Sequence, residues 1–105
     1  MKRAYQQLLT LSAAAMLLSG CAEQQRSESA LEAARVSFYK VKDAPDVLRN
    51  APRDVIRAGE SLARADRYAG YWGNSEDVIH YAYLSQRYSD IASESSQLVL
   101  NQERI

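Results

Sequence analysis

The chain has 105 residues, 47% of them hydrophobic, and its 13 lysine and arginine residues balance 13 aspartate and glutamate residues. After a leader, the remaining ~85 residues form one domain that buries only around 60–65% of its unfolded surface, which disfavours a deep enzyme cleft. Lys2 and Arg3 lie in the leader, so the remainder is slightly acidic and lacks the basic excess of a nucleic-acid binder.

Residues 1–20 have the layout of an export signal. A basic start at residues 1–3 is followed by an apolar run at residues 8–18 and by the small residues Ser19 and Gly20. As a helix the apolar run covers about 16 Å, roughly half of the ~30 Å hydrocarbon core of a bilayer. We therefore expect a cleaved signal peptide and no membrane-spanning segment.

The stretch Leu18-Ser19-Gly20-Cys21 resembles the lipobox of bacterial lipoproteins, in which an aliphatic residue and two small ones precede a lipidated cysteine. The resemblance implies that the thiolate of Cys21 takes up a diacylglyceryl group before the leader is removed, and that its freed amine takes a third chain. Cys21 is the only cysteine, so it has no disulfide partner within the chain. The alternative is an ordinary cut after Ala15, which leaves Cys21 as a small unmodified residue.

Lipidation predicts a tethered protein. Each buried CH₂ contributes about 0.8 kcal/mol and one acyl chain holds only marginally, so two or three chains give lasting attachment. In lipoproteins of this type, Asp after the cysteine commonly retains the protein at the inner membrane, and here that residue is Ala22. We expect a lipid anchor on the periplasmic side of the outer membrane.

The first helix of the mature chain is expected over residues 29–42. The polar residues 22–28 lack apolar periodicity and are interpreted as a linker behind the lipidated cysteine. Ser29 and Glu32 match a capping box. Apolar residues then recur at helical spacing and form one stripe: Leu31, Ala34, Phe38 and Val41.

Two prolines separate this helix from the next. Pro45 and Pro52 follow residues that they bias away from helix, so at most one helical turn is expected between them. Pro52 suits the first position of a second helix that ends near Gly70. The apolar seam of this helix consists of Val55, Ala58, Leu62, Ala65 and Ala69.

A third helix is expected from a cap at Asn74 or Ser75 to about Leu100, followed by a tail over residues 101–105. Its apolar residues keep a seven-residue repeat, which implies left-handed packing against a neighbour. The repeat has three tracks: Tyr81, Tyr88 and Ser95; Leu84, Ile91 and Leu98; and Val78, Ser85, Ala92 and Val99.

Short connections make the second and third helices an antiparallel hairpin. With its turn near residues 73–74, the hairpin sets Tyr81 against Ala65 and Tyr88 against Ala58 and Gly59, so large residues face small ones. The first helix covers the hairpin. The predicted fold is all-α: a small antiparallel helical hairpin or three-helix bundle over residues 29–100.

The sequence offers no catalytic constellation. His80 is the only histidine, four residues after Glu76, and the expected role is a surface pair rather than a metal ligand. Motifs for phosphate binding, zinc hydrolysis or nucleophilic serine are missing. We expect a protein that is not an enzyme and that needs neither metal nor cofactor.

Two surface features are candidate binding sites. The first is a stripe of basic residues that pair well with carboxylates or lipid headgroups, or that form local pairs such as Glu60 with Arg64. The second is the aromatic pair Tyr71 and Trp72, which either stacks on sugars or a bilayer interface or folds back to plug the hairpin. The stripe consists of Arg53, Arg57, Arg64 and Arg67.

The stretches from Ala51 to Asp54 and from Arg57 to Ala65 resemble a family of small helical lipoproteins of Gram-negative bacteria that is defined as a domain of unknown function. The resemblance covers about residues 30 to 95. It implies an envelope location and a helical fold. In that family the domain often precedes an OmpA-like peptidoglycan-binding module, for which no room is expected before Ile105.

The expected function is therefore that of a structural or adaptor lipoprotein. Leu98 and Val99 lie beyond the reach of the second helix and are expected to leave apolar surface for an envelope protein or a second copy of the chain. The alternative is a binding module for cell-wall glycan or anionic lipid, formed by the arginine stripe and Trp72.

Overall fold

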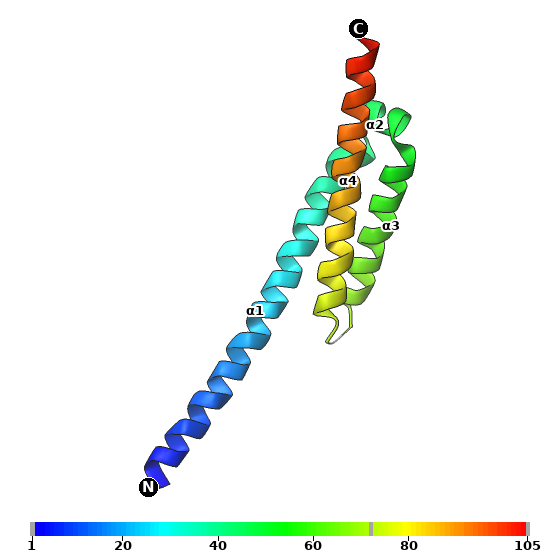
Figure 1. The fold of residues 1–105 in the computed structure, drawn as a ribbon. Helices are drawn as coiled ribbons and strands as arrows, with labels where there is room; N and C mark the ends of the chain where they lie inside the picture. Colours follow the sequence, from blue (N-terminus) through cyan, green and yellow to red (C-terminus); the bar gives the residue numbers. More distant parts are fainter. Residues whose placement is uncertain (1, 72, 105) are drawn as a thin grey trace.

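A computed structural model describes residues 2–71 and 73–104, with side chains from residue 21 onward. The described chain forms four helices and no strand, which confirms the all-α fold (Figure 1). These helices are α1 (Lys2–Lys42), α2 (Pro45–Asn50), α3 (Pro52–Ala69) and α4 (Ser75–Glu103).

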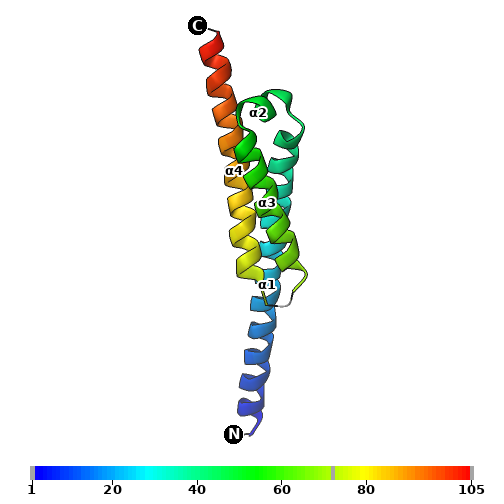
Figure 2. The same ribbon diagram turned by 90° about the vertical axis from the view of Figure 1, so that its right-hand side faces the viewer.

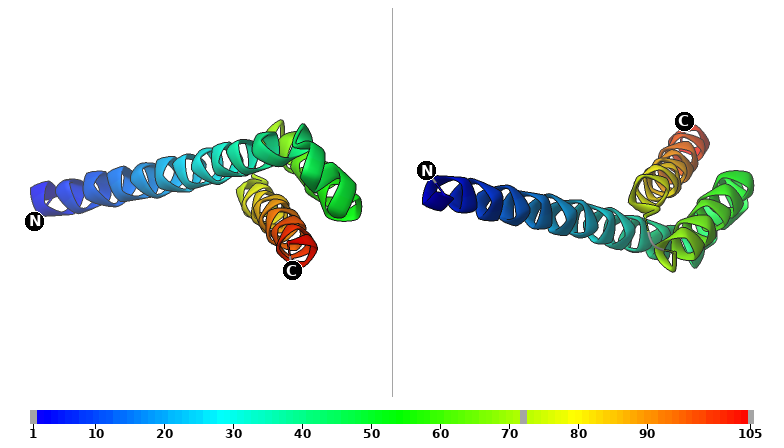
Figure 3. Two further views of the ribbon diagram at one scale, coloured as in Figure 1. Left: turned by 90° about the horizontal axis from the view of Figure 1, so that it is seen from above. Right: turned by 90° about the horizontal axis from the view of Figure 1, so that it is seen from below.

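The helices form a narrow bundle. Helices α3 and α4 run antiparallel, and the second half of α1 packs on them (Figure 2). Toward its N-terminus α1 diverges from the hairpin and projects alone (Figure 3). The short α2 lies near the C-terminal end of α4, opposite the α3–α4 loop (Figure 1).

Prolines and a glycine set the helix boundaries as the sequence predicts. Pro45 and Pro52 occupy the first turns of α2 and α3, and Gly70 is the C-cap of α3. Helix α2 is slightly longer than expected, with six residues. Asn74 is the N-cap of α4, as expected, but its side chain makes no capping hydrogen bond, and Glu76 and Asp77 place negative charge in the first turn.

Helix α1 differs from the expected linker and capping box. It continues through residues 22–28, and Ser29 is an exposed residue inside it rather than its cap. The physical reason is that no proline or glycine occurs between Cys21 and Lys42 to end the helix. Helix α4 likewise continues to Glu103, so most of the expected tail is helical.

The α3–α4 seam is made of small residues. The hydroxyl of Ser85 donates a 2.8 Å hydrogen bond to the carbonyl of Ala58, and Ser89 donates one of 2.9 Å to the carbonyl of Ser85. Both buried hydroxyls therefore have a hydrogen-bond partner. The buried residues of α4 alternate at spacings of four and three: Val78, Ala82, Ser85, Ser89, Ala92 and Ser96.

This seam corrects the expected pairing of Tyr88 with Ala58 and Gly59, whereas Tyr81 packs against the core cluster that contains Ala65. Ser85, not Tyr88, lies against Ala58, and Tyr88 stays half-buried beside the seam. Gly59 is covered by Phe38 of α1, whose ring carbon Cζ would lie 3.1 Å from a Cβ added at Gly59. Small residues let α3 and α4 approach closely, and that leaves the large side chains no space between them.

Helix α1 supplies the larger core residues, as its stripe predicts. Leu31 packs with Leu62 and Val78 in one cluster, and Val41 packs with Val55 in a second. On the surface Arg35 donates a 2.7 Å hydrogen bond to Asp66, which ties α1 to α3. That bond raises the pKa of the Arg35 guanidinium, because the carboxylate of Asp66 stabilises its charged form.

Candidate functional site

Cys21 is exposed and carries a free thiol. It lies within α1, and Leu18, Ser19 and Gly20 precede it in the same helix, where their side chains fall outside the described ones. A thiol at this place is accessible to a modifying enzyme. The structure therefore fits a modified Cys21 without requiring any part of the core to move.

The described part of the core begins after Cys21. Among side chains that the structure describes, the buried ones lie between Ser27 and Ser96. Ser27 is the first of them, and its hydroxyl donates a 2.9 Å hydrogen bond to the carbonyl of Gln24. The described core therefore consists of residues that a cut before Cys21 would leave in the mature chain.

The α3–α4 loop is pinned close to the end of α3. The amide of Gly70 donates a 3.2 Å hydrogen bond to the carbonyl of Arg67. The amide of Tyr71 donates a 3.0 Å hydrogen bond to the carbonyl of Tyr68. Gly73 has φ of +79°, a conformation that side chains other than glycine rarely adopt. The loop therefore turns sharply within a few residues.

Tyr71 does not plug the hairpin. Its side chain is 68% exposed, the largest exposed fraction among the large hydrophobic residues that the structure places at the surface. The predicted role of Trp72 concerns a residue that lies outside the described ones. The described aromatic surface of the loop is therefore that of Tyr71.

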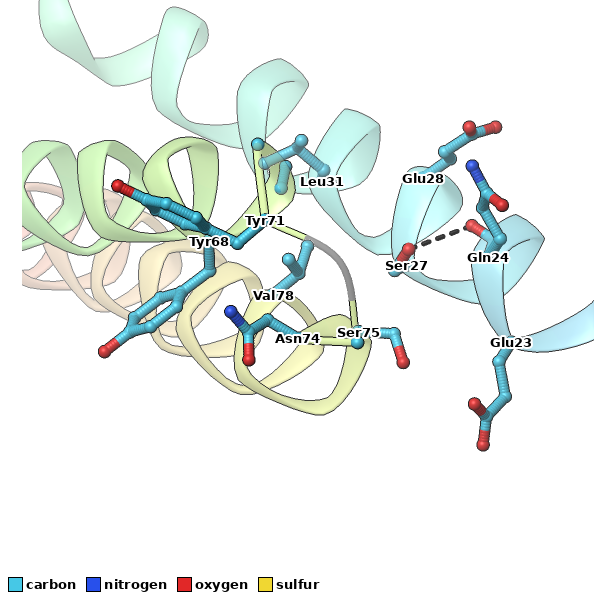
Figure 4. A pocket seen from close by; sticks show the side chains of 13 residues that line it. Glu23, Gln24, Ser27, Glu28, Leu31, Tyr68, Tyr71, Asn74, Ser75 and Val78 are labelled. Carbon is cyan, nitrogen blue, oxygen red and sulfur yellow. Dashed lines mark hydrogen bonds between the residues drawn. The ribbon is translucent and has the colours of Figure 1, made fainter. Parts of the chain in front are cut away.

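The loop and the start of the packed part of α1 line one hollow (Figure 4). Glu23, Gln24 and Ser27 contribute from α1, while Tyr71 and Asn74 contribute from the loop. Leu31, Tyr68 and Val78 form its apolar wall. Sequence reasoning missed this grouping because it assigned Glu23 to Ser27 to a linker, and no local signal places a linker beside a loop that begins more than 40 residues later.

Two residues of the arginine stripe contact aromatic rings of α4. The guanidinium of Arg57 lies 5.9 Å from the ring centre of Tyr88, and that of Arg64 lies 5.6 Å from the ring centre of Tyr81. Tyr81 in turn stacks on Tyr68 at 5.5 Å. These cation–π contacts are favourable, so each of the two arginines would have to give up its ring contact in order to bind a ligand.

Arg53 and Arg67 complete the predicted stripe as exposed residues of α3. The expected local pair of Glu60 with Arg64 is not among the ion pairs of the described residues, and Arg64 lies over an aromatic ring instead. The four arginines of the stripe are therefore exposed, but they do not converge on one point as a single anion site would require.

His80 is exposed, and its ring meets that of Tyr81 edge to face at 5.1 Å. Within residues 21–71 and 73–104 no group of three histidine, cysteine or acidic side chains converges as a metal site. No described helix is long and apolar enough to cross a membrane.

The far end of α4 carries an exposed apolar residue, as predicted. Leu98 is 63% exposed, while Val99 is half-buried. This part of α4 extends past α3 toward the C-terminus (Figure 1). Leu98 therefore lies at the end of the bundle opposite the α3–α4 loop.

Comparison with known proteins gives one match. A family model described as a domain of unknown function (DUF4398) matches residues 29–105. No curated protein and no solved structure matches the chain. The matched residues begin after the predicted signal peptide and include all of α2, α3 and α4.

Proposed function

Since this chain belongs to the DUF4398 family, a domain of unknown function, we propose that it is a lipid-anchored lipoprotein of the cell envelope. The anchor is formed on Cys21 after the signal peptide is removed. The helical bundle then serves as a structural or adaptor module on the periplasmic side of the outer membrane. It holds or joins other envelope components and performs no reaction of its own.

The single observation that carries this proposal is the position of Cys21. The exposed thiol follows a basic, then apolar, then small-residue leader, and it comes six residues before the first buried side chain described, Ser27. An acyl group there meets solvent or lipid and not the core. Three chains on one residue supply the lasting attachment that a single chain lacks.

The adaptor role draws its support from the far end of the bundle. The exposed Leu98 lies on the part of α4 that extends past α3, where the bundle leaves it uncovered. A protein held by lipid at Cys21 presents this end away from its anchor. The partner is another envelope protein or a second copy of the chain.

The anchor is tested by mass spectrometry of the protein purified from membranes of a Gram-negative host. We expect the mature chain to begin at Cys21 and to carry two or three acyl chains. Cys21→Ala should abolish the added mass and, because the leader is removed only after lipidation, leave the leader on the chain. Ser27→Ala, which keeps the thiol, is the matched control, and a bare thiol in the wild type contradicts the proposal.

The adaptor role is tested by crosslinking in intact cells with a photoreactive residue at position 98. We expect one dominant adduct, either a dimer or a defined envelope protein, that is lost when the residue is moved to position 83. Tyr83 is a suitable control because it is 58% exposed on the same helix. Equal, diffuse adducts from both positions contradict a docking role for the far end.

A further inference from the structure

The first step concerns which end of the bundle faces the anchor. Glu23 and Ser27 of α1 line the same hollow as Tyr71 and Asn74 of the α3–α4 loop (Figure 4). The loop therefore lies beside the first turns of α1 that follow Cys21. No flexible linker separates the two, because residues 21–28 are helical.

The second step is the height of the loop above a bilayer. At 1.5 Å per residue, Glu23 lies about 3 Å and Ser27 about 9 Å along α1 from Cys21. A headgroup layer is about 5–7.5 Å thick, half the difference between the ~40–45 Å bilayer and its ~30 Å core. A lipid-modified Cys21 lies at the inner boundary of this layer. With α1 along the bilayer normal, the loop then lies within the headgroups or at their outer edge.

The third step is the chemistry that the loop offers there. Tyr71 is 68% exposed, and tyrosine favours a membrane interface because its ring is apolar while its hydroxyl stays hydrated. Charge gives no attraction to anionic lipid at this end. Two cations stand against four carboxylates in residues 21–28 and 67–77: Arg26 and Arg67 against Glu23, Glu28, Glu76 and Asp77.

We propose that the α3–α4 loop, through Tyr71, is a second membrane contact that inserts into the headgroup layer of the bilayer holding Cys21. The inference rests on the proposed lipid anchor. Two contacts at one end fix the bundle upright and keep it from swivelling on its acyl chains. The opposite end, with α2 and Leu98, then points away from the membrane.

The test uses the acylated protein, purified in detergent and reconstituted into phosphatidylcholine vesicles that carry brominated acyl chains. Two variants hold a single tryptophan each: Trp72→Phe with Tyr71→Trp, and Trp72→Phe with Tyr39→Trp. Tyr39 is a matched control because it is 58% exposed but lies about 27 Å along α1 from Cys21.

We expect the brominated lipid to quench the tryptophan at position 71 and to leave the one at position 39 unchanged. Emission from position 71 should also shift to shorter wavelength, and added salt should alter neither result because the contact is not electrostatic. Mass spectrometry of the same samples reports the acylation of Cys21 separately.

Four outcomes overturn the inference. An acylated Cys21 with no quenching at position 71 disproves the loop contact and leaves the anchor standing. Equal quenching at both positions shows a bundle lying flat on the membrane. Emission from position 71 that responds to soluble cell-wall fragments but not to brominated lipid assigns the loop to glycan. A Cys21 without acyl chains removes the anchor and this inference together.

Discussion

The two interfaces of the bundle differ in the size of the side chains that form them. Where α3 and α4 approach at Ala58 and Ser85, the contact is made by small residues, with Ser85 bonded to the Ala58 carbonyl. Between α1 and the hairpin, larger side chains such as Leu31 and Phe38 fill the space. The hairpin is thus held by close approach and hydrogen bonds, whereas α1 is held by apolar volume.

This difference teaches where each kind of substitution acts. A small-residue seam tolerates little added volume, because close-packed backbones cannot move apart without losing contacts along their length. A large-residue interface is sensitive to lost volume instead, because the cavity that remains is only partly refilled. Four substitutions test the contrast.

The largest expected effect is Leu31→Ala, which removes volume between α1 and the hairpin. Leu31 is 7% exposed, so we expect a loss of about 3 kcal/mol in unfolding free energy. Urea denaturation followed by circular dichroism measures it. Val36→Ala, at a residue 47% exposed on the same helix, should cost less than about 0.5 kcal/mol. Equal losses would show that α1 does not pack as described.

Next comes Ala58→Leu, which adds volume to the α3–α4 seam. Ala58 is fully buried, so we expect a destabilisation of about 2 kcal/mol and a melting temperature lower by about 10 °C. The control is Ala63→Leu on the exposed face of the same helix. An unchanged melting temperature for Ala58→Leu would reject the close approach of α3 to α4.

A smaller effect is expected for Ser85→Ala, which removes the hydrogen bond across the seam but keeps its volume small. The cost should be about 1 kcal/mol, since the Ala58 carbonyl remains within a helix and the new methyl group is not polar. Ser93→Ala, at an exposed position of α4, should be neutral. Chemical denaturation of both variants decides whether the bond contributes.

The smallest effect is expected for Gly59→Ala. Alanine stabilises a helix by about 1 kcal/mol relative to glycine, and the contact with Phe38 offsets that gain. In a chain that already carries Phe38→Leu, Gly59→Ala should raise the unfolding free energy by about 1 kcal/mol, because the shorter side chain leaves space for the added methyl group; a double-mutant cycle measures this difference. If Gly59→Ala stabilises the wild type by the full amount, Phe38 does not cover Gly59.

Prediction from sequence succeeds where single residues begin or end a helix. Pro45, Pro52 and Gly70 mark the helix boundaries of the hairpin and its approach, because each acts on its own backbone. It fails at Ser29, where a local capping pattern is present but nothing ends the preceding helix. The expected pairing of Tyr88 with Ala58 is wrong because hydrophobic periodicity ranks tyrosine above serine, whereas Ser85 is the residue that lies against Ala58.

The candidate site divides in the same way. Cys21 is identified by its immediate neighbours, so sequence alone suffices to select it. The place of Tyr71 beside the start of α1 depends on how three helices meet. Likewise, the arginine stripe is visible in sequence, but the rings under Arg57 and Arg64 come from another helix.

By itself the sequence determined an all-helical chain, the boundaries set by its prolines and glycine, and a cysteine in the context of an export signal. These features depend on neighbouring residues and on backbone stereochemistry. Only the tertiary structure decided that serines form the hairpin seam, that α1 covers Gly59, and that the α3–α4 loop shares an end with Cys21. Packing decides these because close approach favours the smallest side chains, and hydrophobic periodicity alone ranks them last.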